Sequence, residues 1–260
     1  GLVAVQVHTE SGDWVKNPSI SWFITELFGN TDRRVFWSLP LMPKNSSLAE
    51  VAAGKWDDYF RRNAQLLAQT HAGVIDVRTG WEMNGNWFHW NAIKNPDDFI
   101  AAFRRFVTVY RSVSDRFRFE WCPNIGIQAI DPERCYPGDD YVDVVGIDWY
   151  WKPAGQGDPA RGYTDSTDPL VSWERMVSMP RGLQWHRDFA LARNKPVAFS
   201  EWGVMGDNAG PIIRLFAEWI ASAPTPVIYQ NFWDHDAAYQ GKLSGGRWPA
   251  TGAAYKAAFA

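Results

Sequence analysis

The sequence predicts an α/β protein with the (β/α)8 barrel fold, built as a single domain over residues 1–260. Short apolar runs alternate with segments of helical periodicity, which is typical of parallel strands covered by helices on both faces. The length of 260 residues suits one such barrel, and the chain shows neither an internal repeat nor a linker. A doubly wound open sheet is the alternative, but no glycine-rich phosphate-binding fingerprint follows an early strand.

Seven apolar runs are expected to be strands, because they are rich in β-branched and aromatic residues and end at prolines or turn residues. In chain order they are Leu2–His8, Arg34–Leu41, Val74–Thr79, Phe117–Cys122, Val142–Tyr150, Pro196–Glu201 and Pro226–Trp233. Since a (β/α)8 barrel has eight strands, we expect the first strand to be missing or atypical. It would either precede Gly1 or be disguised within residues 1–33.

Segments of helical character separate these runs. The clearest helix start is Asn95-Pro96-Asp97-Asp98, which offers a capping residue, a proline at the first helical position and acids in the first turn. The other expected helices are Ser19–Phe28, Lys55–Gln69, Trp173–Asn194 with a break at Pro180-Arg181-Gly182, Pro211–Ala221 and Gly252–Ala260. Pro153–Leu170, rich in Gly, Pro and Asp, is expected to be a long surface loop.

Composition excludes several classes of function. A net charge of −3 and a pI of about 6.0 do not favour nucleic acid or an anionic membrane as a partner. No run approaches the ~20 apolar residues of a transmembrane helix. The five histidines lack metal-ligand spacing, so we expect no metal and no cofactor. The sixteen tryptophans suit either a large aromatic core or the stacking of indoles on sugar rings. We also expect a monomer.

Cys122 and Cys135 are the only cysteines. A local disulfide and two buried thiols are equal alternatives, and a single disulfide would suit a secreted protein. No signal peptide is visible, but the sequence begins with Gly1 rather than Met, so a removed N-terminal segment stays open. We expect a secreted or extracellular protein.

Two glutamates are the candidate catalytic residues. Glu82 follows the strand Val74–Thr79 and is flanked by tryptophans, and Arg78 should share its strand face because side chains alternate with period two. Glu201 ends another predicted strand and is followed by Trp and Gly. Barrel enzymes carry their chemistry at the C-terminal ends of strands. Two carboxylates across a cleft lined by indoles suit glycoside hydrolysis, whereas a structural ion pair with Arg78 is the alternative for Glu82 alone.

The segment Arg78–Trp90, RTGWEMNGNWFHW, resembles the acid/base motif of glycoside hydrolase family 26, the β-mannanase and lichenase family of clan A. Val144–Tyr150 is similar to the sixth strand of that family, Lys195–Gly203 to the seventh, which carries the nucleophile, and Ile228–Trp233 to the eighth. The resemblance covers roughly residues 34–235. Counting by this family, Leu2–His8 would be the second strand.

Two departures from the family accompany this resemblance. Trp81 stands where the family has a histidine before the acid/base glutamate. Ser38-Leu39-Pro40 stands where the family usually has tryptophan, histidine and proline. Both substitutions fall near the subsites that would hold the reacting sugar. They bear on mannan specificity more than on the mechanism.

The resemblance implies a retaining endo-β-glycosidase that cleaves mannan, β-glucan or a microbial exopolysaccharide. Glu82 would be the acid/base and Glu201 the nucleophile, with the two carboxyl groups ~5–5.5 Å apart. The surrounding indoles should raise the pKa of Glu82, as a general acid requires. A carbohydrate-binding barrel that has lost catalysis is the alternative from a different class.

The remaining expected site residues would bind substrate or hold the nucleophile. Arg78 and Tyr150 would donate hydrogen bonds to Glu201, by position and by resemblance. Trp233 would be the stacking platform beneath the sugar. For each tryptophan expected to line the cleft, packing in the core is the alternative to contact with the sugar. The expected substrate-binding set is Arg78, Trp81, Trp87, Asn124, Asp148, Trp149, Tyr150 and Trp233.

Overall fold

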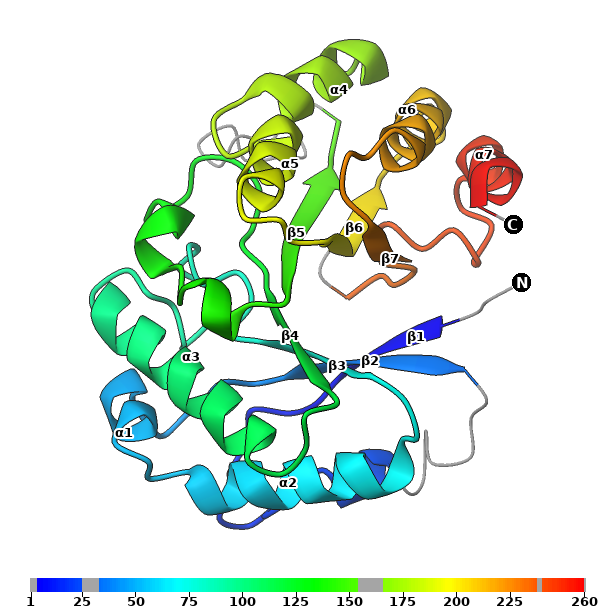
Figure 1. Ribbon diagram of the computed structural model, residues 1–260. Helices are drawn as coiled ribbons and strands as arrows, with labels where there is room; N and C mark the ends of the chain where they lie inside the picture. Colours follow the sequence, from blue (N-terminus) through cyan, green and yellow to red (C-terminus); the bar gives the residue numbers. More distant parts are fainter. Residues whose placement is uncertain (1–3, 25–32, 154–165, 238–239, 260) are drawn as a thin grey trace. The chain divides into compact units, whose positions relative to one another are not determined.

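The computed structural model describes residues 4–24, 33–153, 166–237 and 240–259 (Figure 1). They form two compact units: an N-terminal unit, residues 2–123 with 129–144, and a C-terminal unit, residues 124–128 with 145–260. Parts of four expected elements lie outside the described residues, namely positions 2–3, 25–28, 154–165 and 260. A single domain over residues 1–260 stays a prediction.

The N-terminal unit contains four parallel strands that pair in sequence order. They are β1 (Ala4–His8), β2 (Arg34–Leu39), β3 (Ile75–Thr79) and β4 (Phe117–Trp121). Its helices are α1 (Leu48–Ala52), α2 (Asp57–Thr70) and α3 (Pro96–Arg111), followed by the short 3-10 helices η2 (Pro132–Cys135) and η3 (Asp139–Tyr141).

Alternation along these strands separates an apolar face from a polar one. Val77 of β3 lies in register with Trp37 and Phe119 of the neighbouring strands. Phe119 meets Phe106 of α3 edge to face, with ring centroids 6.1 Å apart, so this apolar face packs against the helices. The polar side chains of β3, including Arg78, therefore lie on the opposite face.

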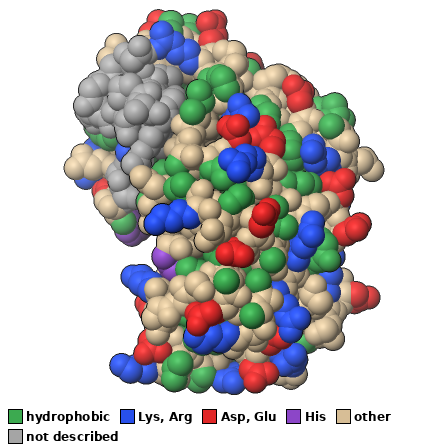
Figure 2. Space-filling model, turned by 90° about the vertical axis from the view of Figure 1, so that its left-hand side faces the viewer, with side chains coloured by type: hydrophobic (Ala, Val, Ile, Leu, Met, Phe, Trp, Pro, Cys, Tyr) green, Lys and Arg blue, Asp and Glu red, His purple; other side chains and the backbone are tan. Residues whose placement is uncertain are grey.

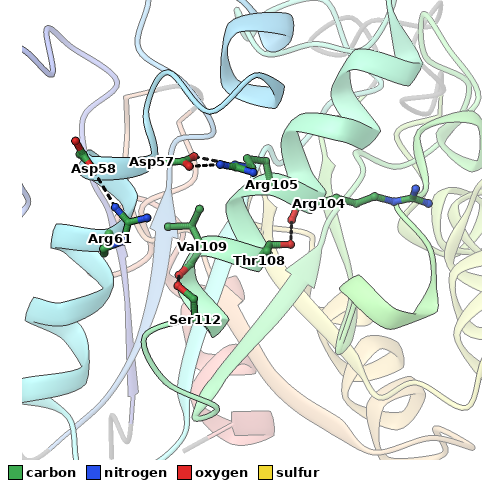
Figure 3. Close-up of polar contacts among 8 residues, drawn as sticks. All are labelled: Asp57, Asp58, Arg61, Arg104, Arg105, Thr108, Val109 and Ser112. Carbon is green, nitrogen blue, oxygen red and sulfur yellow. Dashed lines mark hydrogen bonds and ion pairs between the residues drawn. The ribbon is translucent and has the colours of Figure 1, made fainter.

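The helices α2 and α3 are joined by aromatic packing and by a charged pair. Phe60 of α2 contacts Phe106 with ring centroids 4.8 Å apart. The Arg105 guanidinium forms a two-point ion pair with the Asp57 carboxylate (Figure 3). The same view shows the Thr108 hydroxyl donating to a backbone carbonyl one turn earlier in α3, a local bond that keeps this hydroxyl satisfied.

The C-terminal unit contains three parallel strands, β5 (Val144–Trp151), β6 (Val197–Val204) and β7 (Val227–Phe232). Its helices are α4 (Pro169–Ser178), α5 (Leu183–Leu191), α6 (Gly210–Ala221) and α7 (Pro249–Phe259) (Figure 1). Trp202 of β6 forms its aromatic centre. Its ring stacks on Trp149 at 5.2 Å and contacts Phe216 of α6 at 4.5 Å and Phe232 at 4.9 Å.

The structure adds one helix to the expected elements, corrects the end of one strand, and decides between the two alternatives for the cysteines. Helix α1 was not expected, although Ser47 and Glu50 form a reciprocal capping box at its start. The strand expected to end at Glu201 continues to Val204, so Glu201 lies inside β6. Cys122 and Cys135 are both buried thiols rather than a disulfide.

Acidic and basic side chains are interspersed over the face drawn in Figure 2, in keeping with the small net charge of −3. Within the described ranges, no helix is both long and apolar enough to cross a membrane.

Candidate active site

Glu82 is positioned by a turn rather than by a strand. Strand β3 ends at Thr79, and the backbone then enters the left-handed region at Gly80 (φ 56°) and again at Glu82 (φ 53°). The Glu82 N–H donates to the Cys122 carbonyl at 2.7 Å, which ties the turn to the end of β4. The expectation that Arg78 and Glu82 share one strand face is therefore wrong, because the strand stops between them.

The Glu82 side chain is only 8% exposed and accepts a hydrogen bond from Trp87. The Trp87 Nε1–H donates to Glu82 Oε2 at 2.5 Å, whereas the indole itself remains 37% exposed. Its ring lies directly over Gly85, where a Cβ atom would overlap the six-membered part of the indole. Trp87 is thus held against the acid from one side and open to solvent on another.

Trp81 lies in an aromatic cluster and is 5% exposed. Its ring meets Trp90 at 4.6 Å and Phe88 at 5.5 Å, both edge to face. The Trp90 Nε1–H donates to the Trp81 carbonyl at 2.8 Å, so the cluster also fixes the backbone next to Glu82. Trp81 therefore acts as a supporting wall with little surface of its own.

Arg78 is 2% exposed and sits among polar acceptors. Its Nε–H donates to Ser38 Oγ at 3.0 Å, a guanidinium N–H lies 2.7 Å from His8 Nε2, and the Trp81 ring centroid is 5.0 Å from Cζ. Because a guanidinium can only donate, His8 is the acceptor in this contact, through Nε2. The predicted site residue thus has two partners, His8 and Ser38, that were not placed in the site.

Glu201 is likewise 8% exposed and accepts a hydrogen bond from Tyr150, whose hydroxyl donates to Oε2 at 2.9 Å. Asp148, in register with Glu201, is fully buried. Asn124 pairs with Asp148 through an isolated parallel bridge, and its Oδ1 accepts from Gln128 at 3.0 Å. The C-terminal unit therefore gathers four of the predicted site residues, on β5, on β6 and at the bridge residue Asn124 beside β5.

Two of the expected wall tryptophans have different surroundings. Trp149 is 0% exposed and packs on Trp202 and Phe216, beneath α6, which favours a core role over contact with a sugar. Trp233 is half-buried, and its backbone N–H donates to the Trp202 carbonyl at 2.8 Å. Trp233 is thus anchored to β6 just beyond the end of β7.

The predicted residues therefore fall into two groups. The N-terminal unit brings together Glu82, Arg78, Trp81 and Trp87. The C-terminal unit brings together Glu201, Tyr150, Asp148 and Asn124. The separation of the two carboxyl groups stays a prediction. Among the described residues, no group of three or more His, Cys, Asp and Glu side chains could hold a metal ion.

The family model for glycosyl hydrolase family 26 matches residues 58–171, which contain Glu82 and its motif. The resemblance to family 26 is confirmed. Two curated relatives match as well. A mannan endo-1,4-β-mannosidase of Bifidobacterium adolescentis is 30% identical over 173 residues, 61% of this chain and 16% of that protein. Endoglucanase H of Acetivibrio thermocellus is 30% identical over 118 residues, 42% of this chain and 13% of that protein. The chain thus spans less than a fifth of either relative.

Solved structures show the fold. The catalytic domain of a family 26 endo-β-1,4-mannanase from Bacillus sp. JAMB-750 has a TM-score of 0.57 at 18% identity, covering 85% of this chain and 66% of that one. A family 26 β-mannanase from Bacteroides ovatus has a TM-score of 0.58 at 16% identity, covering 85% and 67%. A fungal β-1,4-galactanase has a TM-score of 0.61 at 12% identity, covering 92% and 80%. The predicted α/β barrel fold is confirmed.

Proposed function

We propose that this protein is a retaining endo-β-glycosidase of the family 26 type that acts on a polysaccharide. The observation that carries the proposal is the matched setting of the two motif glutamates. Glu82 and Glu201 are each only 8% exposed, and each accepts a hydrogen bond from a neighbouring aromatic residue, Trp87 or Tyr150. Buried carboxylates held by donors are suited to chemistry in a cleft from which water is largely excluded.

The proposed reaction is a double displacement. Glu82 donates a proton to the glycosidic oxygen while the Glu201 carboxylate attacks the anomeric carbon, which forms a covalent glycosyl-enzyme. Glu82 then takes a proton from water, which displaces Glu201 with a second inversion. The Tyr150 hydroxyl favours the ionised form of Glu201 that this attack requires.

Mannan is the first substrate to test, because the curated relative with the longer match is named a mannan endo-1,4-β-mannosidase. Mixed-linkage β-glucan is the second, since the other relative is named an endoglucanase. Microbial exopolysaccharides complete the panel, because the buried Trp81 and Ser38 stand where the family has other residues. A polysaccharide substrate also leads us to propose that the protein is secreted and acts as a monomer, which its presence in the culture medium and light scattering would test.

The decisive experiment compares wild type with Glu82→Ala, Glu201→Ala and the control Glu218→Ala, which removes an exposed glutamate of α6. We expect wild type and the control to release oligosaccharides from one polysaccharide of the panel, and both site variants to lose at least about 100-fold in rate. Azide should restore turnover of Glu201→Ala on an activated aryl glycoside. The first product observed by NMR should keep the β configuration.

Two outcomes would overturn parts of the proposal. Full activity of Glu201→Ala without azide, or a first product of α configuration, would refute the nucleophile assignment. If wild type binds oligosaccharides but cleaves none of the panel, the alternative of a carbohydrate-binding barrel without catalysis is correct.

A further inference from the structure

The contact between Trp87 and Glu82 has a direction that chemistry fixes. The indole nitrogen carries a hydrogen and has no lone pair to offer, so it can donate a hydrogen bond but not accept one. In the 2.5 Å contact, Glu82 Oε2 must therefore be the acceptor. This holds both for the ionised carboxylate and for the neutral acid, in which the carbonyl-type oxygen is the better acceptor.

The local backbone is arranged to make this contact. Glu82 adopts a left-handed conformation (φ 53°), which residues other than glycine, asparagine and aspartate rarely take. Three residues later, the bare backbone of Gly85 leaves the space that the Trp87 ring fills. The Gly85 N–H also donates to the Glu82 carbonyl at 3.0 Å, which closes the turn between them. The left-handed backbone of Glu82 and the missing side chain of Gly85 both allow the Trp87 indole to reach the Glu82 carboxyl group.

We propose that Trp87 is the positioning residue of the acid/base: its indole N–H holds Oε2 and so fixes the orientation of the carboxyl group that transfers the proton. The inference rests on the proposed function, because it assumes that Glu82 is the acid. In the first half-reaction the proton leaves the Glu82 carboxyl group for the glycosidic oxygen, which keeps the electron pair of the breaking C–O bond while Glu201 bonds to the anomeric carbon. In the second half-reaction a water proton returns to the Glu82 carboxylate as the water oxygen bonds to the anomeric carbon, and the Glu201 carboxylate leaves with the electron pair of its bond to that carbon.

A positioning role differs measurably from a sugar-stacking role. Protonation of the leaving group matters for a sugar leaving group but little for 2,4-dinitrophenolate, which departs without help. A residue that orients the acid therefore affects the first class of substrate selectively. A residue that only stacks on the sugar affects both classes alike.

The experiment uses the full chain and three variants. Trp87→Phe keeps an aromatic ring but removes the N–H, Gly85→Ala keeps the indole but displaces it, and Trp22→Phe is the control at an indole that is 58% exposed. The substrates are the polysaccharide found in the panel and the 2,4-dinitrophenyl β-glycoside of its disaccharide. We expect Trp87→Phe and Gly85→Ala to lose about tenfold in kcat/KM on the polysaccharide, the size of one hydrogen bond to a charged group.

On the dinitrophenyl substrate, kcat/KM of both variants should stay within about threefold of wild type, because this ratio reports the first half-reaction, in which the leaving group needs no proton. Trp22→Phe should match wild type on both substrates. The alkaline limb of kcat against pH should move to higher pH in Trp87→Phe, because the ionised carboxylate has lost a donor. If Trp87→Phe fails to fold, the same selective loss in Gly85→Ala supports the proposal.

Equal losses on the two substrates, or an alkaline limb at its wild-type position, would overturn the positioning role. Glu82→Ala separates this failure from failure of the proposed function. If Glu82→Ala shows the selective loss on the polysaccharide and Trp87→Phe does not, only the role of Trp87 is refuted. If Glu82→Ala retains full activity on both substrates, the assignment of Glu82 as the acid fails first.

Discussion

At the scale of single residues, one buried hydroxyl beside Arg78 accepts hydrogen bonds from two donors. Ser38 Oγ accepts from Arg78 Nε at 3.0 Å and from Gln6 Nε2 at 2.8 Å. Alternation and strand register explain the meeting, because Ser38 lies beside Arg78 on β3 and beside His8 on β1. One small hydroxyl thus helps to hold the buried Arg78 guanidinium.

Ser38→Ala should lower the free energy of unfolding by about 1–3 kcal/mol, because the buried Arg78 guanidinium and the half-buried Gln6 amide both lose this acceptor. Urea denaturation of the variant measures this loss. Ser178→Ala, at an exposed serine near the end of α4, is the matched control and should stay within about 0.5 kcal/mol of wild type. Equal stability of Ser38→Ala and the control would show that Ser38 is not needed to satisfy Arg78.

The sequence identified Arg78 but not the residues that hold it. Arg78 stands in a specific motif, whereas His8 and Ser38 come from two other strands and carry no local signal. Their proximity follows only once the parallel register is known. A period-two reading of all three strands together would have placed them on one polar face. The alternation within any one of these strands does not show that the three residues meet.

At the scale of elements, buried polar links fix helices to strands. His186 of α5 is 1% exposed, and its Nε2–H donates to the Val145 carbonyl of β5 at 2.9 Å. Burial lowers the pKa of His186 to about 4, although the bond to Val145 acts in the opposite direction. The imidazole is therefore neutral in the folded protein at neutral pH, and α5 is attached to β5 by a group that titrates.

Acid should weaken this attachment in a defined pH range. The folded-state pKa of His186, about 4, lies below its ordinary value of 6.5, so the unfolded chain binds more protons between these two pH values. Stability from this group is complete above about pH 6.5 and is lost as the pH falls toward 4, by roughly 3 kcal/mol at most.

Urea midpoints of wild type and His186→Gln at pH 7 and pH 4.5 test this link. The glutamine amide can still donate to the carbonyl but does not titrate, so the acid-induced loss should be smaller in the variant. His235→Gln, at an exposed histidine, should keep the wild-type dependence on pH. A loss in His186→Gln as large as in wild type would refute the assignment.

Element boundaries show where sequence patterns were sufficient and where they were not. The cores of all seven expected strands are confirmed, because runs of apolar residues are readable without tertiary information. The continuation of β6 past Glu201 was missed, since a charged residue in a run suggests an end. The buried Trp202 and Val204 show that the run continues, with Glu201 inside it. Helix α1 is too short to show helical periodicity, and its capping box is the sequence signal that could have predicted it.

At the scale of the whole molecule, the fold class was predictable and the two cysteines were not. The alternation of strands and helices specifies a barrel, but sequence spacing alone cannot distinguish a disulfide from two thiols. Cys122 and Cys135 are both 0% exposed as thiols. Burial also raises the pKa of Cys135 to about 12, so little reactive thiolate forms near neutral pH.

The native protein should therefore react slowly with Ellman's reagent, and the denatured protein should release two equivalents of thiol at once. Because the thiols close no covalent loop, dithiothreitol should leave the Tm unchanged. Near-stoichiometric labelling of the native protein would contradict the burial. A Tm that falls on reduction would show that the cysteines are paired.

The left-handed backbone at Glu82 means that the proposed acid lowers the stability of the folded protein. Glycine tolerates φ 53° without the steric cost that glutamate incurs there, about 1 kcal/mol. Replacing Glu82 by glycine also removes a carboxyl group that is 8% exposed. We expect Glu82→Gly to be inactive on polysaccharide and yet to unfold at a higher temperature than Glu82→Ala, with calorimetry as the measurement. If Glu82→Gly unfolds at the lower temperature of the two, this backbone is not strained. The residue on which turnover is proposed to depend is thus one that folding alone would not have selected.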